Sequence, residues 1–168
     1  MENIDMHTRF LHHATKLVCL LFIFASSQAL AIKAPDFSLP GDKKTIALKD
    51  YRKKVVYVDF WASWCTPCKQ SFPWMSEMQK RYKKEGLEII AINVDKDRSL
   101  ATEFLEQSVP GFTIAYDPEG KVAESYDLSV MPSSFLIDRK GKLVHVHKGF
   151  KTTEKNAMEG KIKSLLSK

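Results

Sequence analysis

Cysteine is scarce in this sequence: Cys19, Cys65 and Cys68 are the only three among 168 residues. A framework of structural disulfides needs more cysteines at wider spacing, so a disulfide-stapled scaffold is excluded. A structural zinc site needs about four ligands, usually from two pairs. Beside the close pair Cys65 and Cys68, residues 32–168 offer only His145 and His147 as further ligands for zinc. We therefore expect no metal site.

The sequence also lacks low-complexity stretches, internal repeats and Gly/Ser-rich linkers. Hydrophobic residues make up 44% and charged residues 27%, which are ordinary globular values and argue against a disordered chain or a multi-span membrane protein. The net charge of +6 comes from scattered lysines, without a dense basic tract or interleaved aromatic residues. We therefore expect a solvated basic surface and no nucleic-acid partner.

No apolar run reaches the roughly 20 residues needed to cross a bilayer comfortably, but the N-terminal part holds a shorter one. Arg9 and Lys16 precede an apolar run over residues 17–25, and a small-residue site, Ala-Leu-Ala, follows at residues 29–31. This order is typical of an export signal peptide. We predict a signal peptide over residues 1–31, with an uncleaved membrane anchor as the alternative, and one folded domain over residues 32–168.

Cys19 lies within the apolar run, ahead of the small-residue site. A lipid anchor requires its cysteine directly after the cleavage point, so we interpret Cys19 as part of the leader. Cleavage then leaves Cys65 and Cys68 in an exported protein. A single close pair in such a protein is better explained by redox chemistry than by scaffolding.

The mature part alternates between strand-like and helix-like patterns. The expected strands lie at residues 36–39, 45–48, 55–58, 87–94, 112–116, 134–137 and 143–147, and the expected helices at residues 68–84, 101–106, 122–126 and 153–166. The first two strands flank a Pro-Gly turn and predict a hairpin. Pro73 should kink the first long helix, and Gly86 should end it. This order predicts an α/β fold with a mixed central sheet flanked by helices.

The cysteine pair stands between a predicted buried strand and a predicted helix. At the helix N-terminus, unpaired N–H groups and the helix dipole stabilise a thiolate. We expect Cys65 to attack a partner's disulfide and Cys68 to resolve the mixed disulfide. Pro67 suits a first helical turn, and Thr66 and Pro67 should tune the redox potential. Trp61 and Trp64 could help to dock a protein partner, with core packing as the alternative for each.

Residues 58–68, VDFWASWCTPC, resemble the active-site segment of thioredoxins. Residues 34–168 resemble the exported TlpA/ResA-like branch of that superfamily, through the N-terminal hairpin, Pro73, an inserted helix and strand after Val94, and the segment VMPSSFLID at residues 130–138. The resemblance implies a thioredoxin-like fold. It also implies a thiol–disulfide oxidoreductase whose redox-active disulfide replaces any other cofactor.

The resemblance assigns roles to residues outside the cysteine motif. It implies that Met131–Pro132 is a cis peptide beside the disulfide and that Met131 and Pro132 help dock a substrate polypeptide. Asp59 lies in an apolar run, where burial should raise its pKa. The resemblance implies that this acid shuttles a proton for Cys68, as a general acid and base.

The branch also predicts a setting for the chemistry. It favours a reductase that a membrane electron donor keeps reduced, with a role in c-type cytochrome maturation. We expect partner proteins that bear thiols or disulfides, and a monomer. From the leader we expect a periplasmic or otherwise exported protein, membrane-anchored if the leader is retained. Two departures stand out: residues 69–71 are Lys-Gln-Ser where relatives often carry an acid, and a functional glutamate after the second strand is matched at best by Asp95.

Three rival functions use related residues. A disulfide oxidase or isomerase would use the same cysteine pair and differ in redox potential. A copper-binding metallochaperone on the same fold would need His145 and His147, for which a solvated strand face is the simpler explanation. A thiol peroxidase typically has a threonine three residues before its cysteine, and Ala62 stands there.

Overall fold

The computed structural model describes residues 32–168, so the predicted signal peptide and Cys19 lie outside the described residues. The strands are β1 (Ser38–Pro40), β2 (Thr45–Ala47), β3 (Val55–Trp61), β4 (Leu87–Asn93), β5 (Thr113–Tyr116), β6 (Ser133–Ile137) and β7 (Leu143–Lys148). The α-helices are α2 (Thr66–Tyr82), α3 (Arg98–Gln107), α4 (Lys121–Ser125) and α5 (Lys155–Leu166), and short 3-10 turns are η1 (Leu48–Tyr51), η2 (Lys83–Glu85) and η3 (Thr152–Glu154). None of the helices in residues 32–168 has the length and hydrophobicity that a bilayer crossing requires.

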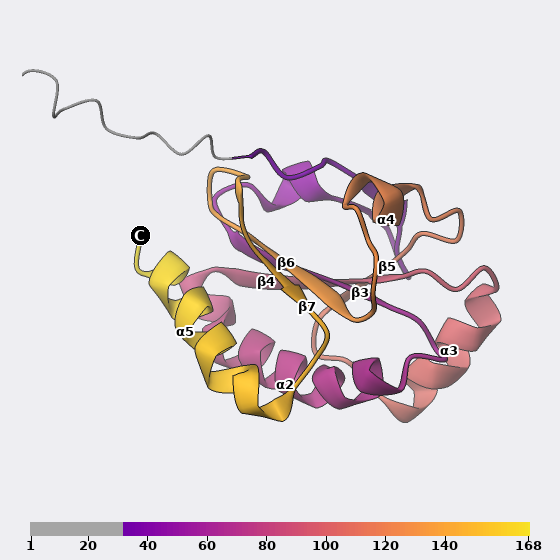
Figure 1. The fold of residues 1–168 in the computed structure, drawn as a ribbon. Helices are drawn as coiled ribbons and strands as arrows, with labels where there is room; N and C mark the ends of the chain where they lie inside the picture. Colours follow the sequence, from indigo (N-terminus) through magenta and orange to yellow (C-terminus); the bar gives the residue numbers. More distant parts are fainter. Residues whose placement is uncertain (1–31) are drawn as a thin grey trace, which may run out of the picture. The chain divides into compact units, whose positions relative to one another are not determined.

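Five strands form the central sheet in the order β5-β4-β3-β6-β7 (Figure 1). Strand β3 runs parallel to β4, and β4 runs parallel to β5. Strand β6 is antiparallel to both β3 and β7. All seven residues of β3 are buried, as expected of β-branched and aromatic residues in a strand covered on both faces. The predicted mixed sheet and the separate β1–β2 hairpin are confirmed.

Helices α2, α3 and α5 cover one face of the sheet, whereas α4 and the N-terminal hairpin cover the other (Figure 1). Successive side chains of β3 alternate between these layers. Tyr57 and Trp61 pack in the cluster that contains both cysteines of α2, and Val58 and Phe60 pack in the opposite cluster. Asp59 is two residues from both Tyr57 and Trp61 along β3, so its side chain points to the same face of the sheet, toward α2.

Helix α2 begins two residues earlier than its apolar spacing predicts, with Cys65 as its N-cap, and it continues through Pro73. The chain leaves the following 3-10 turn at Gly86, whose φ of 102° is left-handed and favours glycine. The inserted elements after Val94 are α3 and β5. Asp97 caps α3 by accepting a hydrogen bond of 2.9 Å from the Ser99 backbone N–H.

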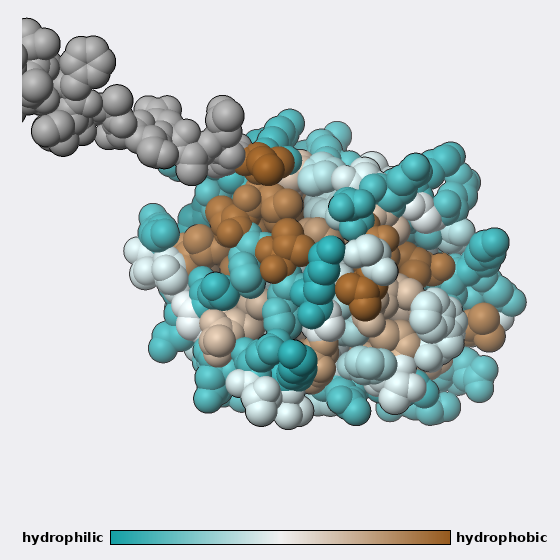
Figure 2. Space-filling model, viewed as in Figure 1, coloured by the Kyte–Doolittle hydropathy of each residue, from teal (hydrophilic) through white to brown (hydrophobic). Residues whose placement is uncertain are grey.

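Strand β7 presents its histidines differently from the expected solvated face. His145 and His147 are half-buried, and they alternate along the strand with the exposed side chains of Val144 and Val146. His147 Nε2 lies 3.3 Å from a carboxylate oxygen of Glu154. Apolar side chains gather over the β6–β7 region among hydrophilic ones (Figure 2). Within residues 32–168, no three His, Cys, Asp or Glu side chains are arranged to hold a metal ion.

Candidate active site

Cys65 and Cys68 form a disulfide at the start of α2. The Cys65 carbonyl accepts a hydrogen bond of 3.0 Å from the Cys68 N–H, and the Cys65 N–H donates to the Ala62 carbonyl, also at 3.0 Å. These contacts place the pair where β3 ends and the helix begins. Cys65 is 4% exposed and Cys68 is 0% exposed, so an attacking thiol can reach only the first sulfur without rearrangement of the chain.

The helix start favours negative charge on Cys65. The positive end of the α2 dipole lies at the N-cap, which Cys65 occupies. None of residues 66–69 is acidic, so no carboxylate in the first turn repels the negative charge of a thiolate at Cys65. Pro67 lies in this turn, where its missing N–H breaks no helical hydrogen bond. The arrangement therefore suits a thiolate at Cys65 when the disulfide is reduced.

Asp59 is a buried acid on the same face of the sheet as the disulfide. It is 1% exposed, and its Oδ1 accepts a hydrogen bond of 2.8 Å from Ser134 Oγ. Its other oxygen, Oδ2, has no hydrogen-bond partner within the described part of the chain. Burial raises the pKa of Asp59 from 3.8 to about 7, although the Ser134 hydrogen bond opposes the rise. The group can therefore gain or lose a proton near neutral pH.

Asp95 holds the loop that carries the cysteine motif. Its carboxylate accepts hydrogen bonds from the Ser63 N–H at 2.8 Å and from the Ser63 hydroxyl at 3.1 Å. The Asn93 side-chain amide donates to the same carboxylate at 2.8 Å, and the Asp95 N–H donates back to the Asn93 side chain. Asp95 is therefore a positioning residue, tying the β3–α2 loop to the end of β4.

Trp64, Met131 and Pro132, the residues expected to dock a substrate, have different environments. Trp64 is 68% exposed, so core packing is not its role. The Met131–Pro132 peptide is cis, and Met131 is half-buried against the cluster that contains both cysteines. The Pro132 carbonyl accepts a hydrogen bond of 2.8 Å from the Gly149 N–H. Trp64 therefore exposes its indole next to Cys65 in the chain, and Met131 packs against the same buried cluster as the two cysteines.

A cluster of buried aromatic rings packs α2 against the sheet and against α3. The Trp61 ring lies edge-on to Phe72 of α2, with centroids 5.0 Å apart, and 4.8 Å from Phe104 of α3. Phe72 and Phe104 also contact each other at 5.0 Å. Trp61 is fully buried, so it packs the core and offers no surface to a partner. These contacts fix α2 against the sheet and the inserted helix.

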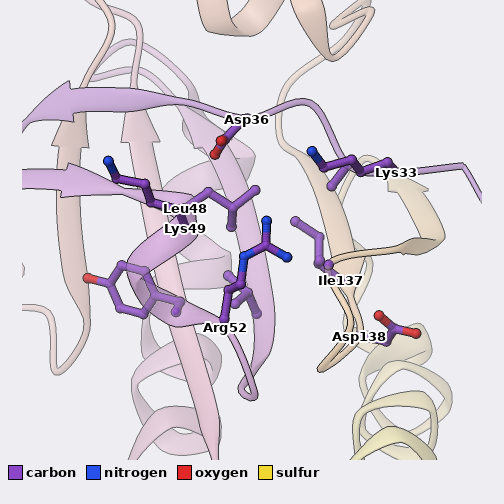
Figure 3. Close-up of a pocket in the computed structure, with 11 residues that line it drawn as sticks. Lys33, Asp36, Leu48, Lys49, Arg52, Ile137 and Asp138 are labelled. Atoms are coloured by element: carbon purple, nitrogen blue, oxygen red, sulfur yellow. The ribbon is translucent and has the colours of Figure 1, made fainter.

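A separate small cavity lies at the other end of β3. Its wall includes Val56 near the start of that strand and is ringed by charged side chains from Lys33, Asp36, Lys49, Arg52 and Asp138 (Figure 3). The cavity volume of about 20 Å³ is close to the space that one water molecule occupies. It is too small for an organic ligand and takes no part in the site around the disulfide.

Comparison with known proteins supplies the family. The Redoxin family model matches residues 30–162. The chain belongs to the Redoxin family. Among its relatives, the thiol–disulfide oxidoreductase ResA of Bacillus subtilis is 35% identical over 133 residues, covering 77% of this chain and 74% of the relative. The ResA of Bacillus thuringiensis subsp. konkukian is 37% identical over 123 residues, covering 73% and 71%.

Solved structures agree with this Redoxin assignment. The crystal structure of a thiol:disulfide interchange protein of the DsbE type from Chlorobium tepidum has 48% sequence identity and a TM-score of 0.80, covering 81% of this chain and 96% of that one. This Redoxin-family protein therefore has a thioredoxin-like fold and is a thiol–disulfide oxidoreductase with the redox-active pair Cys65–Cys68. Its partners bear thiols or disulfides.

Two residues of the site were missed by the sequence analysis. Ser134 donates to Asp59, and the Tyr57 hydroxyl donates to Ser134 Oγ at 2.6 Å. Tyr57 lies two residues before Asp59 and Ser134 lies two residues after Pro132. The period of two in strands could have placed Tyr57 on the face of Asp59. The pairing of β6 with β3, which puts Ser134 opposite Asp59, was visible only in the structure.

Proposed function

We propose that this protein is an exported reductase of protein disulfides. The observation that carries the proposal is the Cys65–Cys68 pair at the start of α2, on the same sheet face as the buried acid Asp59. The leader-like residues 1–31 support export. A relative from Streptococcus pneumoniae, 33% identical with a TM-score of 0.70 and covering 78% of this chain and all of that one, is named an exposed lipoprotein thioredoxin, which also supports it.

The reaction begins with the reduced protein. The Cys65 thiolate attacks one sulfur of a partner's disulfide, forming a mixed disulfide and releasing the partner's other sulfur as a thiolate. Asp59 takes the proton of the Cys68 thiol. The Cys68 thiolate then attacks Cys65, which forms the Cys65–Cys68 disulfide and releases the partner's second thiolate. Each cycle transfers two electrons to the partner, and a membrane-bound dithiol donor restores the reduced pair.

The partner side of the reaction is a polypeptide segment around a disulfide. Trp64 offers an exposed indole, and Met131 and Pro132 form the adjacent loop against which the segment would dock. We propose apocytochromes c as the partner class, because their Cys-x-x-Cys-His segments must be reduced before haem is attached. Thr66 and Pro67 set how strongly the helix start stabilises the Cys65 thiolate, and hence the redox potential.

The test combines a defined substrate with the state of the pair in cells. The reduced protein should reduce a disulfide-bonded Cys-x-x-Cys-His peptide, and a Cys65→Ser variant should not. In cells, alkylation of free thiols should find the pair mostly reduced when the membrane donor is present. A pair that is mostly oxidised at steady state, together with oxidation of reduced peptide, would identify a disulfide oxidase and refute the reductase.

A further inference from the structure

Three buried hydroxyl and carboxyl groups form a hydrogen-bonded chain across β3 and β6. The Tyr57 hydroxyl donates to Ser134 Oγ at 2.6 Å, and the Ser134 hydroxyl donates to Asp59 Oδ1 at 2.8 Å. All three residues are buried, and Ser134 lies directly opposite Asp59 in the strand pairing. This series of hydrogen bonds ends at Asp59, the acid to which the proposed function assigns the proton shuttle.

Tyr57 sets the donor-to-acceptor direction of these hydrogen bonds. Burial, together with the neighbouring Asp59 charge, raises the pKa of Tyr57 far above its ordinary value. The phenol therefore stays protonated and acts as the donor to Ser134. A hydroxyl has one proton to donate, so Ser134 gives its own to Asp59 Oδ1. Oδ1 is thus occupied as an acceptor, whereas Oδ2 has no partner among residues 32–168.

We propose that Ser134, oriented by Tyr57, is a positioning residue for the proton shuttle: it holds Asp59 Oδ1 as an acceptor and leaves Oδ2 as the atom that exchanges a proton with Cys68. This inference rests on the proposed role of Asp59 and deepens it. In the resolving step, the proton leaves the Cys68 thiol and binds Oδ2, while the Cys68 thiolate forms its bond with Cys65. The proton then passes to the departing partner thiolate or to water.

The Ser134 hydroxyl also limits how strongly Asp59 holds its proton. A hydrogen bond to the charged form of a carboxylate stabilises that form, so it opposes the effect of burial on the pKa. Without Ser134, Asp59 would be buried with both oxygens unpartnered. It would then stay protonated to higher pH and accept a proton from Cys68 less readily.

The other titratable groups on this face are few. Cys65 and Cys68 of α2 are joined in the disulfide and do not titrate in the oxidised protein. On β7, His147 lies opposite Ser134 and its imidazole is 3.3 Å from Glu154. On β4, the neighbour opposite Asp59 is Ala91, which does not titrate. Tyr57 also lies on this face, and its raised pKa keeps the phenol protonated across the neutral range. The Asp59 carboxyl signal therefore has to be followed by itself, with the His147 imidazole controlled by substitution.

The test follows the ¹³C chemical shift of the Asp59 carboxyl in the oxidised protein as a function of pH. Ser134→Ala should raise the midpoint by about 1–2 pH units, the range for loss of a hydrogen bond to a charged group. Tyr57→Phe should raise it less. Ser134→Thr keeps the hydroxyl and should return the midpoint to within about 0.5 unit of the wild type, and His147→Gln is the control for the neighbouring imidazole.

An unchanged midpoint in Ser134→Ala would overturn the inference, as would a rise of equal size in Ser134→Thr. The rate of mixed-disulfide resolution against pH separates this inference from the proposed function. If Asp59→Asn leaves that pH profile unchanged, Asp59 is not the shuttle and the proposed role fails, whatever the carboxyl titration shows. If Asp59→Asn changes the profile and Ser134→Ala does not, only the role of Ser134 fails.

Discussion

Replacement of Asp59 by asparagine should make the stability of the oxidised protein less dependent on pH. The pKa of Asp59 rises from 3.8 in an ordinary environment to about 7 in the folded protein. The difference is about three pKa units, and each unit corresponds to ~1.4 kcal/mol. Ionised Asp59 therefore lowers the free energy of unfolding by about 4 kcal/mol relative to the neutral acid, because the single hydrogen bond from Ser134 only partly offsets the burial of the charge.

The sign follows from which state holds the proton. Well below pH 3.8 the carboxyl is protonated in both states, so Asp59 contributes no penalty to the free energy of unfolding. As the pH rises, the unfolded chain loses this proton first, so the folded state is progressively disfavoured until the pH passes about 7. The advantage of Asp59→Asn should therefore grow by about 4 kcal/mol between about pH 4 and pH 8, and it should level off above that range.

Urea unfolding of both oxidised proteins at several pH values measures this difference. Any fixed cost of the asparagine amide in the buried site is the same at each pH and cancels from the trend. Asp50→Asn removes the same charge at an exposed position and controls for net charge. A difference between wild type and Asp59→Asn that stays constant from pH 4 to pH 8 would refute the reasoning.

The remaining predictions concern the loop and the surface. Asp95→Ala removes the acceptor of both Ser63 hydrogen bonds. It should lower the free energy of unfolding by about 2–3 kcal/mol and slow disulfide exchange. Asp97→Ala removes only the α3 cap, so in urea unfolding it should cost about 1 kcal/mol and leave the exchange rate unchanged. Equal losses in the two variants would contradict this. Trp64→Ala, at an exposed position, should change stability by less than about 0.5 kcal/mol and raise KM for a protein disulfide several-fold. Reaction with a small aromatic disulfide should stay unchanged; a matching loss there would show that Trp64 acts on the cysteines and not on the partner.

The sequence predicted the fold because its local signals agree with one another. The apolar run of β3, the cysteine motif after it and the helical spacing that follows define a strand–helix unit without ambiguity. The apolar spacing predicts a start of α2 two residues too late, since Thr66 and Pro67 are exposed and do not contribute to the apolar face of the helix. The cap of α3 needed the structure, because Asp97 and Ser99 are both good N-cap residues.

The sequence predicted only those site residues that lie close together along the chain. Cys65, Cys68 and the apolar surroundings of Asp59 lie in one segment of eleven residues, residues 58–68. Ser134 is 75 residues from Asp59 along the chain, and Asp95 is 32 residues from Ser63. Their contacts depend on strand order and register, which no local pattern encodes. The half-buried histidines of β7 likewise depend on the helix that packs beside that strand.

The central claim is that Cys65 attacks the partner and Cys68 resolves the mixed disulfide with the help of Asp59. Trapping measures this most directly. Each single variant is expressed in reduced form, exposed to disulfide-bonded partner, and separated without reductant. Cys68→Ser should accumulate a covalent complex that a thiol reductant releases, and Cys65→Ser should not. Equal trapping by the two variants, or trapping by Cys65→Ser alone, would contradict the assignment of nucleophile and resolving cysteine.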